Sequence, residues 1–219
     1  MIPLRALLRR QSPALVTALI IVLNVVVFLF EDFQPGYRQN AFIAHYALVP
    51  DHLRPFSLLT SMFLHGGWLH LIGNMWFLWV FGSHVEDAMG PARFLVFYLI
   101  SGILSGMVQL AMSLGSPVPT IGASGAIAGV MGGFLMLYPR ARVVTLVILI
   151  VFITTVELPA AVMLIYWFVI QLVSGLTSFN SFNATDQGGV AWFAHVGGFL
   201  AGLLLVRVFQ SNNRRRYIY

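Results

Sequence analysis

The sequence predicts an all-α, polytopic membrane protein built as a bundle of six transmembrane helices. Of its 219 residues, 59% are hydrophobic and only 9% are charged, and its mean hydropathy is +0.87. A chain with so few polar side chains cannot cover the surface of a water-soluble fold. We expect one membrane domain over residues 1–219, without a separate soluble domain. The predicted spans are approximately residues 14–30, 68–82, 94–114, 122–138, 158–176 and 190–209.

The first apolar run, residues 14–30, could pass for a signal peptide because three arginines precede it. No small-residue cleavage site follows it and further apolar runs lie downstream, so we expect a retained first span. Residues 31–56 are too polar to cross a membrane and too apolar for a free linker, which favours a position in the interface. An amphipathic turn at residues 57–64 is expected to lead into the second span.

Two neighbouring apolar runs, residues 143–153 and 158–176, must be separate elements. Fused into one helix they would be about 50 Å long, well beyond a hydrocarbon core of about 30 Å. The first run is rich in β-branched residues and too short to cross as a helix, whereas Glu157 and Pro159 are typical of a new helix start. Only the second run is therefore counted as a span.

The basic residues indicate the orientation of the chain. All 12 of them are arginines, and ten fall on the side where six spans place the two termini, leaving Arg38 and Arg54 opposite. The positive-inside rule then predicts that both termini are cytoplasmic. The same rule accounts for the high pI of about 10.1, so no nucleic-acid partner is needed to explain the excess of basic residues. The chain has no cysteine, so disulfides and thiolate ligands are excluded.

Four polar side chains inside the predicted spans lie at one depth. Ser124 begins the fourth span, His195 lies near the outer end of the sixth, and His70 and Asn74 share a face of the second because they are four residues apart. All four should lie roughly 5 to 10 Å below the outer interface. Each could serve only as a packing hydrogen bond between helices, which contributes about 0.6 kcal/mol. Four such groups at one level favour a functional site instead.

Small residues at four-residue spacing flank Ser124 in the fourth span and His195 in the sixth. The two stripes consist of Gly125, Gly129, Gly133, Ala194, Gly198 and Gly202. Stripes of this kind let helix backbones approach closely, and packing alone would explain them. The same approach would also bring His195 within about 3 Å of Ser124 Oγ, as a general base requires.

A serine hydrolase also needs donors for the developing oxyanion, each worth about 3 kcal/mol. Backbone N–H groups are free at the start of the fourth span, and His70 and Asn74 add side-chain donors. No carboxylate is evident as a third member, so the sequence predicts a Ser124–His195 dyad rather than a triad. This chemistry needs neither a metal ion nor another cofactor, and we expect none.

These motifs resemble those of the rhomboid family of intramembrane serine proteases, bacterial members in particular, over essentially the whole chain. Residues 122–125 are similar to the family's GxSG motif, and residues 194–202 are similar to its AHxxGxxxG motif. His65, His70 and Asn74 resemble its second-span pattern of histidines and asparagine.

The resemblance implies Ser124 as the nucleophile and His195 as the general base. It also implies that His70, Asn74 and the Ser124 amide form the oxyanion hole.

Further positions resemble the family less directly. Ser105 and Gln109 lie in a segment similar to the one that holds water near the site, which implies a role in water supply. Glu86 resembles a structural feature after the second span, and Arg54 occupies the position of an arginine in the long first loop. Ala128 is a departure, because some bacterial members have an aromatic residue there that stacks on the catalytic histidine.

The main functional hypothesis is an intramembrane serine endopeptidase of the bacterial inner membrane that cleaves transmembrane segments of other proteins. Its expected partners are transmembrane protein substrates and the lipid bilayer, and no oligomeric state is predicted. The fifth span and the loop 177–189 are expected to move to admit substrate. The alternatives are a catalytically silent rhomboid-like protein that binds membrane helices and a small transporter or channel. Both a serine and a histidine are present, which disfavours the first, and clustering toward one leaflet disfavours the second.

Overall fold

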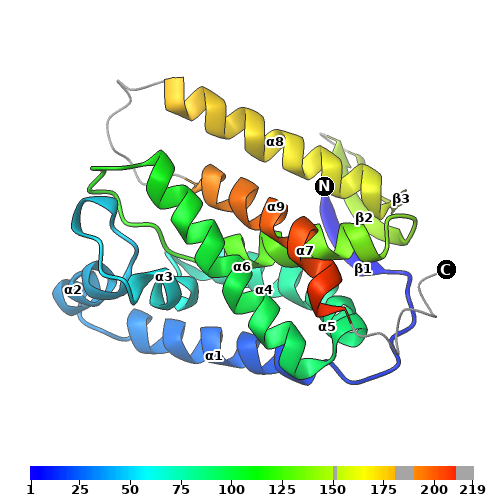
Figure 1. Ribbon diagram of the computed structural model, residues 1–219, viewed down its shortest axis with the longest axis horizontal. Coiled ribbons are helices and arrows are strands. Elements are labelled where there is room, and N and C mark those ends of the chain that lie inside the picture. The colour runs from blue at the N-terminus through cyan, green and yellow to red at the C-terminus, as the bar shows by residue number, and fades with distance from the viewer. Residues whose placement is uncertain (150–151, 181–189, 211–219) are drawn as a thin grey trace.

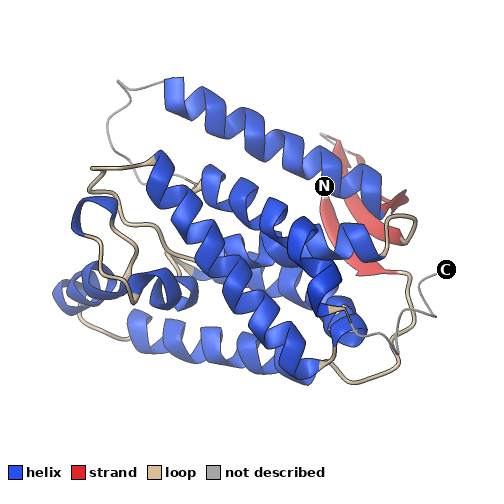
Figure 2. Ribbon diagram, viewed as in Figure 1, coloured by secondary structure: helices blue, strands red, loops and turns tan. Residues whose placement is uncertain are grey.

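The computed structural model describes residues 1–149, 152–180 and 190–210 as a helical bundle with a small sheet at one end (Figures 1 and 2). The helices are α1 (Leu15–Asp32), α2 (Gly36–Tyr46), α3 (Ser57–Thr60), α4 (Trp68–Phe77), α5 (Ser83–Met89), α6 (Pro91–Met112), α7 (Ser124–Leu137), α8 (Ala160–Asn180) and α9 (Trp192–Phe209). Shorter helical segments are η1 (Pro50–His52), η2 (Ser61–Phe63) and the π-helical η3 (Leu78–Gly82), which joins α4 to α5 without a break. The strands are β1 (Ile2–Ala6), β2 (Arg142–Leu149) and β3 (Phe152–Pro159).

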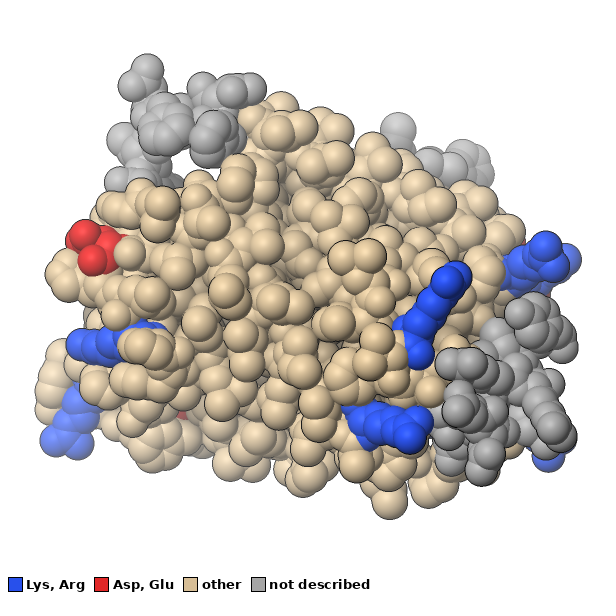
Figure 3. Space-filling model, in the orientation of Figure 1, with Lys and Arg blue, Asp and Glu red and all other residues tan. Residues whose placement is uncertain are grey.

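The helical membrane bundle that the composition predicts is confirmed. Within the described residues, α1, α6, residues 160–177 of α8, and α9 are long and apolar enough to cross a bilayer. On the face drawn in Figure 3, a broad band without charged side chains separates the basic residues at one end of the molecule from those at the other. The count of six spans stays a prediction, because α7 has only 14 residues and the predicted second span, residues 68–82, is divided between α4 and the π-helical η3.

Helix α7 lies at the centre of the bundle, and nearly all of its residues are buried. Its small side chains let neighbouring backbones approach, and a Cβ atom added at Gly132 would overlap the carbonyl oxygen of Phe199 in α9. Because lipid offers no hydrophobic drive for helix association, this close van der Waals packing is what holds such helices together.

The three strands form an antiparallel sheet in the order β1-β2-β3. Strands β2 and β3 make a hairpin in which Arg142 pairs with Pro159, and β1 adds to its other edge with Ile2 opposite Leu146. The sequence predicts a short, separate β-branched element at residues 143–153 but not the sheet to which it belongs. Leu158 and Pro159 belong to β3, so α8 begins at Ala160, two residues later than the predicted fifth span.

Parts of two predicted features lie outside the described residues. They are residues 181–189 of the predicted entry loop and the C-terminal arginines at 214–216.

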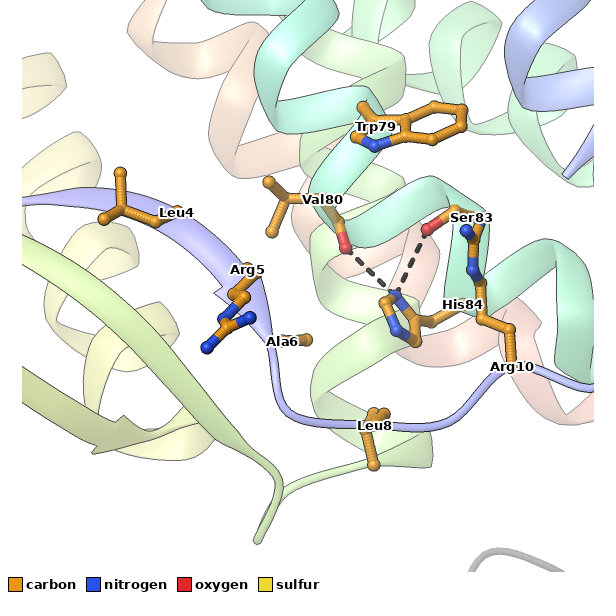
Figure 4. A pocket seen from close by; sticks show the side chains of 9 residues that line it. All are labelled: Leu4, Arg5, Ala6, Leu8, Arg10, Trp79, Val80, Ser83 and His84. Carbon is orange, nitrogen blue, oxygen red and sulfur yellow. Dashed lines mark hydrogen bonds between the residues drawn. The ribbon is translucent and has the colours of Figure 1, made fainter.

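A hollow of about 220 Å³ lies between the N-terminal segment and the junction of η3 with α5 (Figure 4). Its lining residues are Leu4, Arg5, Ala6, Leu8, Arg10, Trp79, Val80, Ser83 and His84. The His84 ring packs edge-on to Phe134 in the last turn and a half of α7. The hollow therefore belongs to the end of the bundle away from Ser124, which begins the same helix.

The carboxylate of Glu86 ties α5 to the first turn of α1. It is buried and accepts hydrogen bonds from the Val16 N–H at 2.9 Å, the Thr17 N–H at 2.8 Å and the Thr17 hydroxyl at 2.7 Å. These N–H groups have no partner inside α1, and a negative charge at a helix N-terminus is favourable. One side chain thus satisfies three donors and fixes where α1 enters the bundle.

Replacing Glu86 with alanine is expected to destabilise the protein by about 3 kcal/mol, because hydrogen bonds to a charged acceptor contribute about 1.5 to 3 kcal/mol and buried donors would be left unpaired. Denaturant unfolding in detergent micelles, followed by circular dichroism, measures the loss. The matched control is Glu157→Ala, which removes an exposed ion pair with Arg142 and should cost about 1 kcal/mol at most. Equal losses in the two variants would contradict the prediction.

Candidate active site

Ser124 and His195 come together at the start of α7 and the first turn of α9. The hydroxyl oxygen of Ser124 lies 2.8 Å from Nε2 of His195, and the His195 side chain is buried. The segment before Ser124 is held from two sides. Thr120 exchanges two backbone hydrogen bonds with Leu48, and the Gly122 N–H donates to the carbonyl of Ser61 at 2.9 Å. The first loop therefore fixes the position of the serine.

The glycine stripes set the distance between the two helices. A Cβ atom added at Gly198 would overlap the carbonyl oxygen of Gly125, and one added at Gly202 would overlap that of Gly129. Any larger residue at these positions would push α9 away from α7. The close approach of the two backbones is therefore what allows a short serine and a histidine to meet.

Ser105 and Gln109 of α6 hold the backbone of Ala194, next to His195. The Ser105 hydroxyl donates to the Ala194 carbonyl at 2.8 Å, and the Ala194 N–H donates to Gln109 Oε1 at 3.1 Å. Ala194 is in the first turn of α9, where N–H groups lack helical partners. Both side chains therefore have a structural role beside the base, and their role in water supply stays a prediction.

His70 and Asn74 point from α4 toward the backbone just before Ser124. A Cβ atom added at Gly122, whose φ is +121°, would lie 2.8 Å from His70 Nε2 and 3.6 Å from Asn74 Nδ2. His70 Nδ1 is placed to accept the Gly66 N–H at 3.4 Å, which leaves the proton on Nε2, facing the site. The Asn74 amide nitrogen is buried without a hydrogen-bond partner. Two donors thus converge beside the nucleophile.

His65 and Arg54 brace the first loop rather than the dyad. The His65 ring is buried, its centroid lies 5.1 Å from that of His70, and its backbone N–H donates to the Glu31 carboxylate at 3.3 Å. Burial lowers the pKa of His65 to about 4, with the charge of His70 adding to the effect. Arg54 donates to the backbone carbonyls of Ala44 and His45 at the end of α2.

Two residues of α8 that the sequence analysis missed contact His195. Gln171 is buried, and its Oε1 lies 2.7 Å from His195 Nδ1. The Trp167 ring centroid lies 5.7 Å from that of His195. This tryptophan provides an aromatic neighbour where α7 has only Ala128. The available signal was a lone amide inside an apolar span, which marks a functional position by the same reasoning as Ser124.

No group of three or more acidic, histidine or cysteine side chains that could hold a metal ion occurs among residues 1–149, 152–180 and 190–210. The described residues bring together a serine hydroxyl, a histidine ring nitrogen and two side-chain donors, an arrangement that can support nucleophilic catalysis.

Comparison with known proteins relates the chain to one family. The family model described as the Rhomboid domain matches residues 52–212. The chain is 31% identical to the rhomboid protease GluP of Bacillus subtilis over 193 residues, which is 86% of this chain and 34% of GluP. It is 26% identical to the rhomboid protease GlpG of Photorhabdus laumondii over 214 residues, covering 94% of this chain and 67% of GlpG. The human presenilin-associated rhomboid-like protein is 30% identical over 126 residues, 56% of this chain and 33% of that protein.

The chain spans about a third of the length of GluP and two thirds of GlpG. The match of the Rhomboid domain covers most of the chain, including both glycine-flanked motifs and the second-span histidine and asparagine. The protein is therefore an integral, multi-pass membrane protein that belongs to the rhomboid family.

Proposed function

We propose that the protein is an intramembrane serine endopeptidase that cleaves transmembrane segments of other membrane proteins through a Ser124–His195 dyad. The observation that carries the proposal is the 2.8 Å contact between Ser124 Oγ and His195 Nε2, which joins a half-buried serine to a buried histidine beside the side chains of His70 and Asn74. A general base must lie within about 2.6 to 3.2 Å of the proton it abstracts. The protease names of GluP and GlpG agree with this function.

In the first half-reaction, Ser124 Oγ attacks the scissile carbonyl carbon while its proton passes to His195 Nε2. The carbonyl oxygen becomes an oxyanion, held by the Ser124 N–H and by the side chains of His70 and Asn74. The tetrahedral intermediate collapses when the C–N bond breaks and His195 donates the proton to the leaving amine. The products of this step are an acyl-enzyme and the released amine fragment.

In the second half-reaction, water gives a proton to His195 and attacks the acyl carbon. The bond between the acyl carbon and Ser124 Oγ then breaks, His195 returns the proton to Oγ, and the acid fragment is released. We assign the supply of this water to Ser105 and Gln109, since both are fixed against Ala194 beside the base. Their hydrogen bonds to the backbone leave the lone pairs of Ser105 Oγ for a water molecule.

The proposed substrate is a membrane helix that can unwind locally and that carries a small side chain before the scissile bond. A helix must unwind before its carbonyl becomes accessible, and the glycine- and alanine-rich wall of α7 leaves little room for a large side chain. The arginine distribution supports cytoplasmic termini, with the dyad toward the opposite leaflet of a bacterial inner membrane.

Ser124→Ala is expected to abolish cleavage of a type I membrane substrate by the purified protein in detergent, because no other group of the dyad can form the acyl-enzyme. A fluorophosphonate probe should label the wild-type protein and neither Ser124→Ala nor His195→Ala. Cleavage by Ser124→Ala at the wild-type rate would show that the mechanism is wrong. A wild-type protein that binds the substrate but neither cleaves it nor takes the label would favour a catalytically silent binding protein.

Asn74→Ala is expected to lower kcat by about 100- to 1,000-fold with little change in KM, because an oxyanion donor acts mainly in the transition state. Steady-state kinetics with a fluorogenic membrane substrate measures both constants. Thermal unfolding should change little, since the buried Asn74 amide nitrogen has no partner to lose. A variant that loses stability but keeps its kcat would assign Asn74 to packing instead.

A disulfide between α8 and α9 is expected to block membrane substrates but not small probes. A Cβ atom at Gly175 would lie 3.2 Å from Cβ of Trp192, near the spacing of about 3.8 Å in disulfides, and the chain has no cysteine of its own. The oxidised double variant Gly175→Cys/Trp192→Cys should keep fluorophosphonate labelling and lose cleavage. Reduction of the same sample is the control and should restore cleavage. Undiminished cleavage in the oxidised form would exclude entry through a moving α8.

A further inference from the structure

Helix α8 is an apolar helix that turns one polar side chain toward the centre of the bundle. Its buried face, at helical spacing, includes Ala160, Leu164 and Gln171, and Gly175 continues it against Trp192. The opposite face, with Val162, Ile165, Val169 and Val173, is exposed and suited to lipid. Gln171 is the one buried polar side chain of α8 among those that the structure describes.

The partner of Gln171 is the ring nitrogen of His195 that does not face the serine. General-base catalysis requires that the Ser124 hydroxyl donates its hydrogen bond to Nε2, and in that tautomer the proton of the neutral ring is on Nδ1. Nδ1–H then donates to Gln171 Oε1 across 2.7 Å. The amide therefore occupies the position that a carboxylate holds in a Ser-His-Asp triad, where it fixes the tautomer and orientation of the imidazole.

We propose that Gln171 is a positioning residue for His195, so that the base is correctly oriented only while α8 is packed against α9. This inference rests on the proposed serine protease function and deepens it. Trp167, one helical turn earlier on α8, contacts the same ring, and Phe168 stacks on Phe199 of α9 at 4.8 Å. Helix α8 thus supplies a hydrogen bond and a ring contact to His195, while Trp192 of α9 lies edge-on to the same ring at 6.4 Å.

The consequence for the reaction is an ordered sequence. When α8 moves outward to admit a membrane helix, His195 Nδ1–H loses its acceptor and the ring loses the contact with Trp167. When α8 returns over the bound substrate, the hydrogen bond re-forms and Nε2 again faces Ser124. Substrate entry and assembly of the dyad are therefore coupled through Gln171. While α8 is displaced, the Ser124 hydroxyl is a poor nucleophile.

The first test compares Gln171→Met, which keeps the length of the side chain but removes the strong acceptor, with Gln171→Glu, which keeps an acceptor and adds charge. We expect Gln171→Met to lower kcat by about 10- to 100-fold with KM changed less than about twofold, within the range of general-base effects. Fluorophosphonate labelling should slow by a similar factor. Gln171→Glu should retain most of the activity.

The pH–rate profile distinguishes a positioning role from a purely structural one, because a loss of packing alone would not shift the acidic limb of kcat. A carboxylate at position 171 stabilises the imidazolium form, so the acidic limb of kcat should move to higher pH by about one unit or more. In Gln171→Met that limb should move to lower pH, because the imidazolium loses its acceptor. His70 of α4 is the titratable side chain whose charge acts on His195, and it is unchanged in both variants. Ser124 of α7 contacts the ring, and Ser105 and Gln109 of α6 bind the backbone of the adjacent Ala194. None of these three side chains ionises in this range.

The matched control is Val169→Ala on the exposed face of α8, which leaves both the packing of α8 on α9 and the hydrogen bond to His195 in place. It should leave the acidic limb unchanged. If Gln171→Met does not fold, Gln171→Glu alone still tests the inference. A folded, active Gln171→Glu variant whose acidic limb does not move would overturn it. Wild-type kinetics in Gln171→Met would also overturn it and leave the proposed function standing. A wild-type protein that is neither active nor labelled would instead overturn the proposed function.

Discussion

The backbone contact between α7 and α9 is the constraint on which the other features of this bundle depend. At two successive levels a glycine of α9 lies directly against a carbonyl of α7, with Gly198 on Gly125 and Gly202 on Gly129. Helices in lipid associate through such packing rather than through the hydrophobic effect. Because the contact begins one turn from Ser124 and His195, the interaction that holds the bundle together also sets the distance of the dyad. Helix α6 adds to it by binding Ala194 through Ser105 and Gln109.

The polar groups of the bundle fall into two kinds. Glu86, Ser105, Gln109 and Gln171 each meet a partner inside the protein, as an apolar surrounding demands. The Asn74 amide nitrogen does not, and neither do the hydroxyl groups of Tyr98 and Ser101, although a buried unpaired donor costs about 1 to 3 kcal/mol. The Asn74 nitrogen differs from these hydroxyls in lying beside Gly122, two residues before Ser124. An unpaired donor in that place is what preorganised stabilisation of an oxyanion requires, since a donor already engaged would have to break a bond during the reaction.

The sequence was sufficient for the helical membrane class and for singling out Ser124 and His195, which the structure brings into contact, because a serine or histidine inside an apolar run is visible without knowing its neighbours. The sheet could not be predicted in the same way, since Ile2 pairs with Leu146 and neither segment carries a local sign of the other. The role of Gln171 could be predicted only from the orientation of α8 about its own axis. That orientation depends on how the buried face of α8 packs on α9. The absence of a carboxylate in the spans led to the prediction of a dyad without a third member, but an amide can accept the same hydrogen bond.

An amide suits a moving helix better than a carboxylate would. When α8 is displaced, its inner face must meet lipid or the incoming substrate, and a charged side chain at that depth costs about 2.5 to 3.5 kcal/mol even on the insertion scale. A neutral glutamine costs less, so the helix can leave and return without a large barrier. The same neutrality stabilises the imidazolium less than a carboxylate does, which lowers the basicity of His195. If Gln171 orients His195 as proposed, the third position of the site represents a balance between the strength of the base and the mobility of α8.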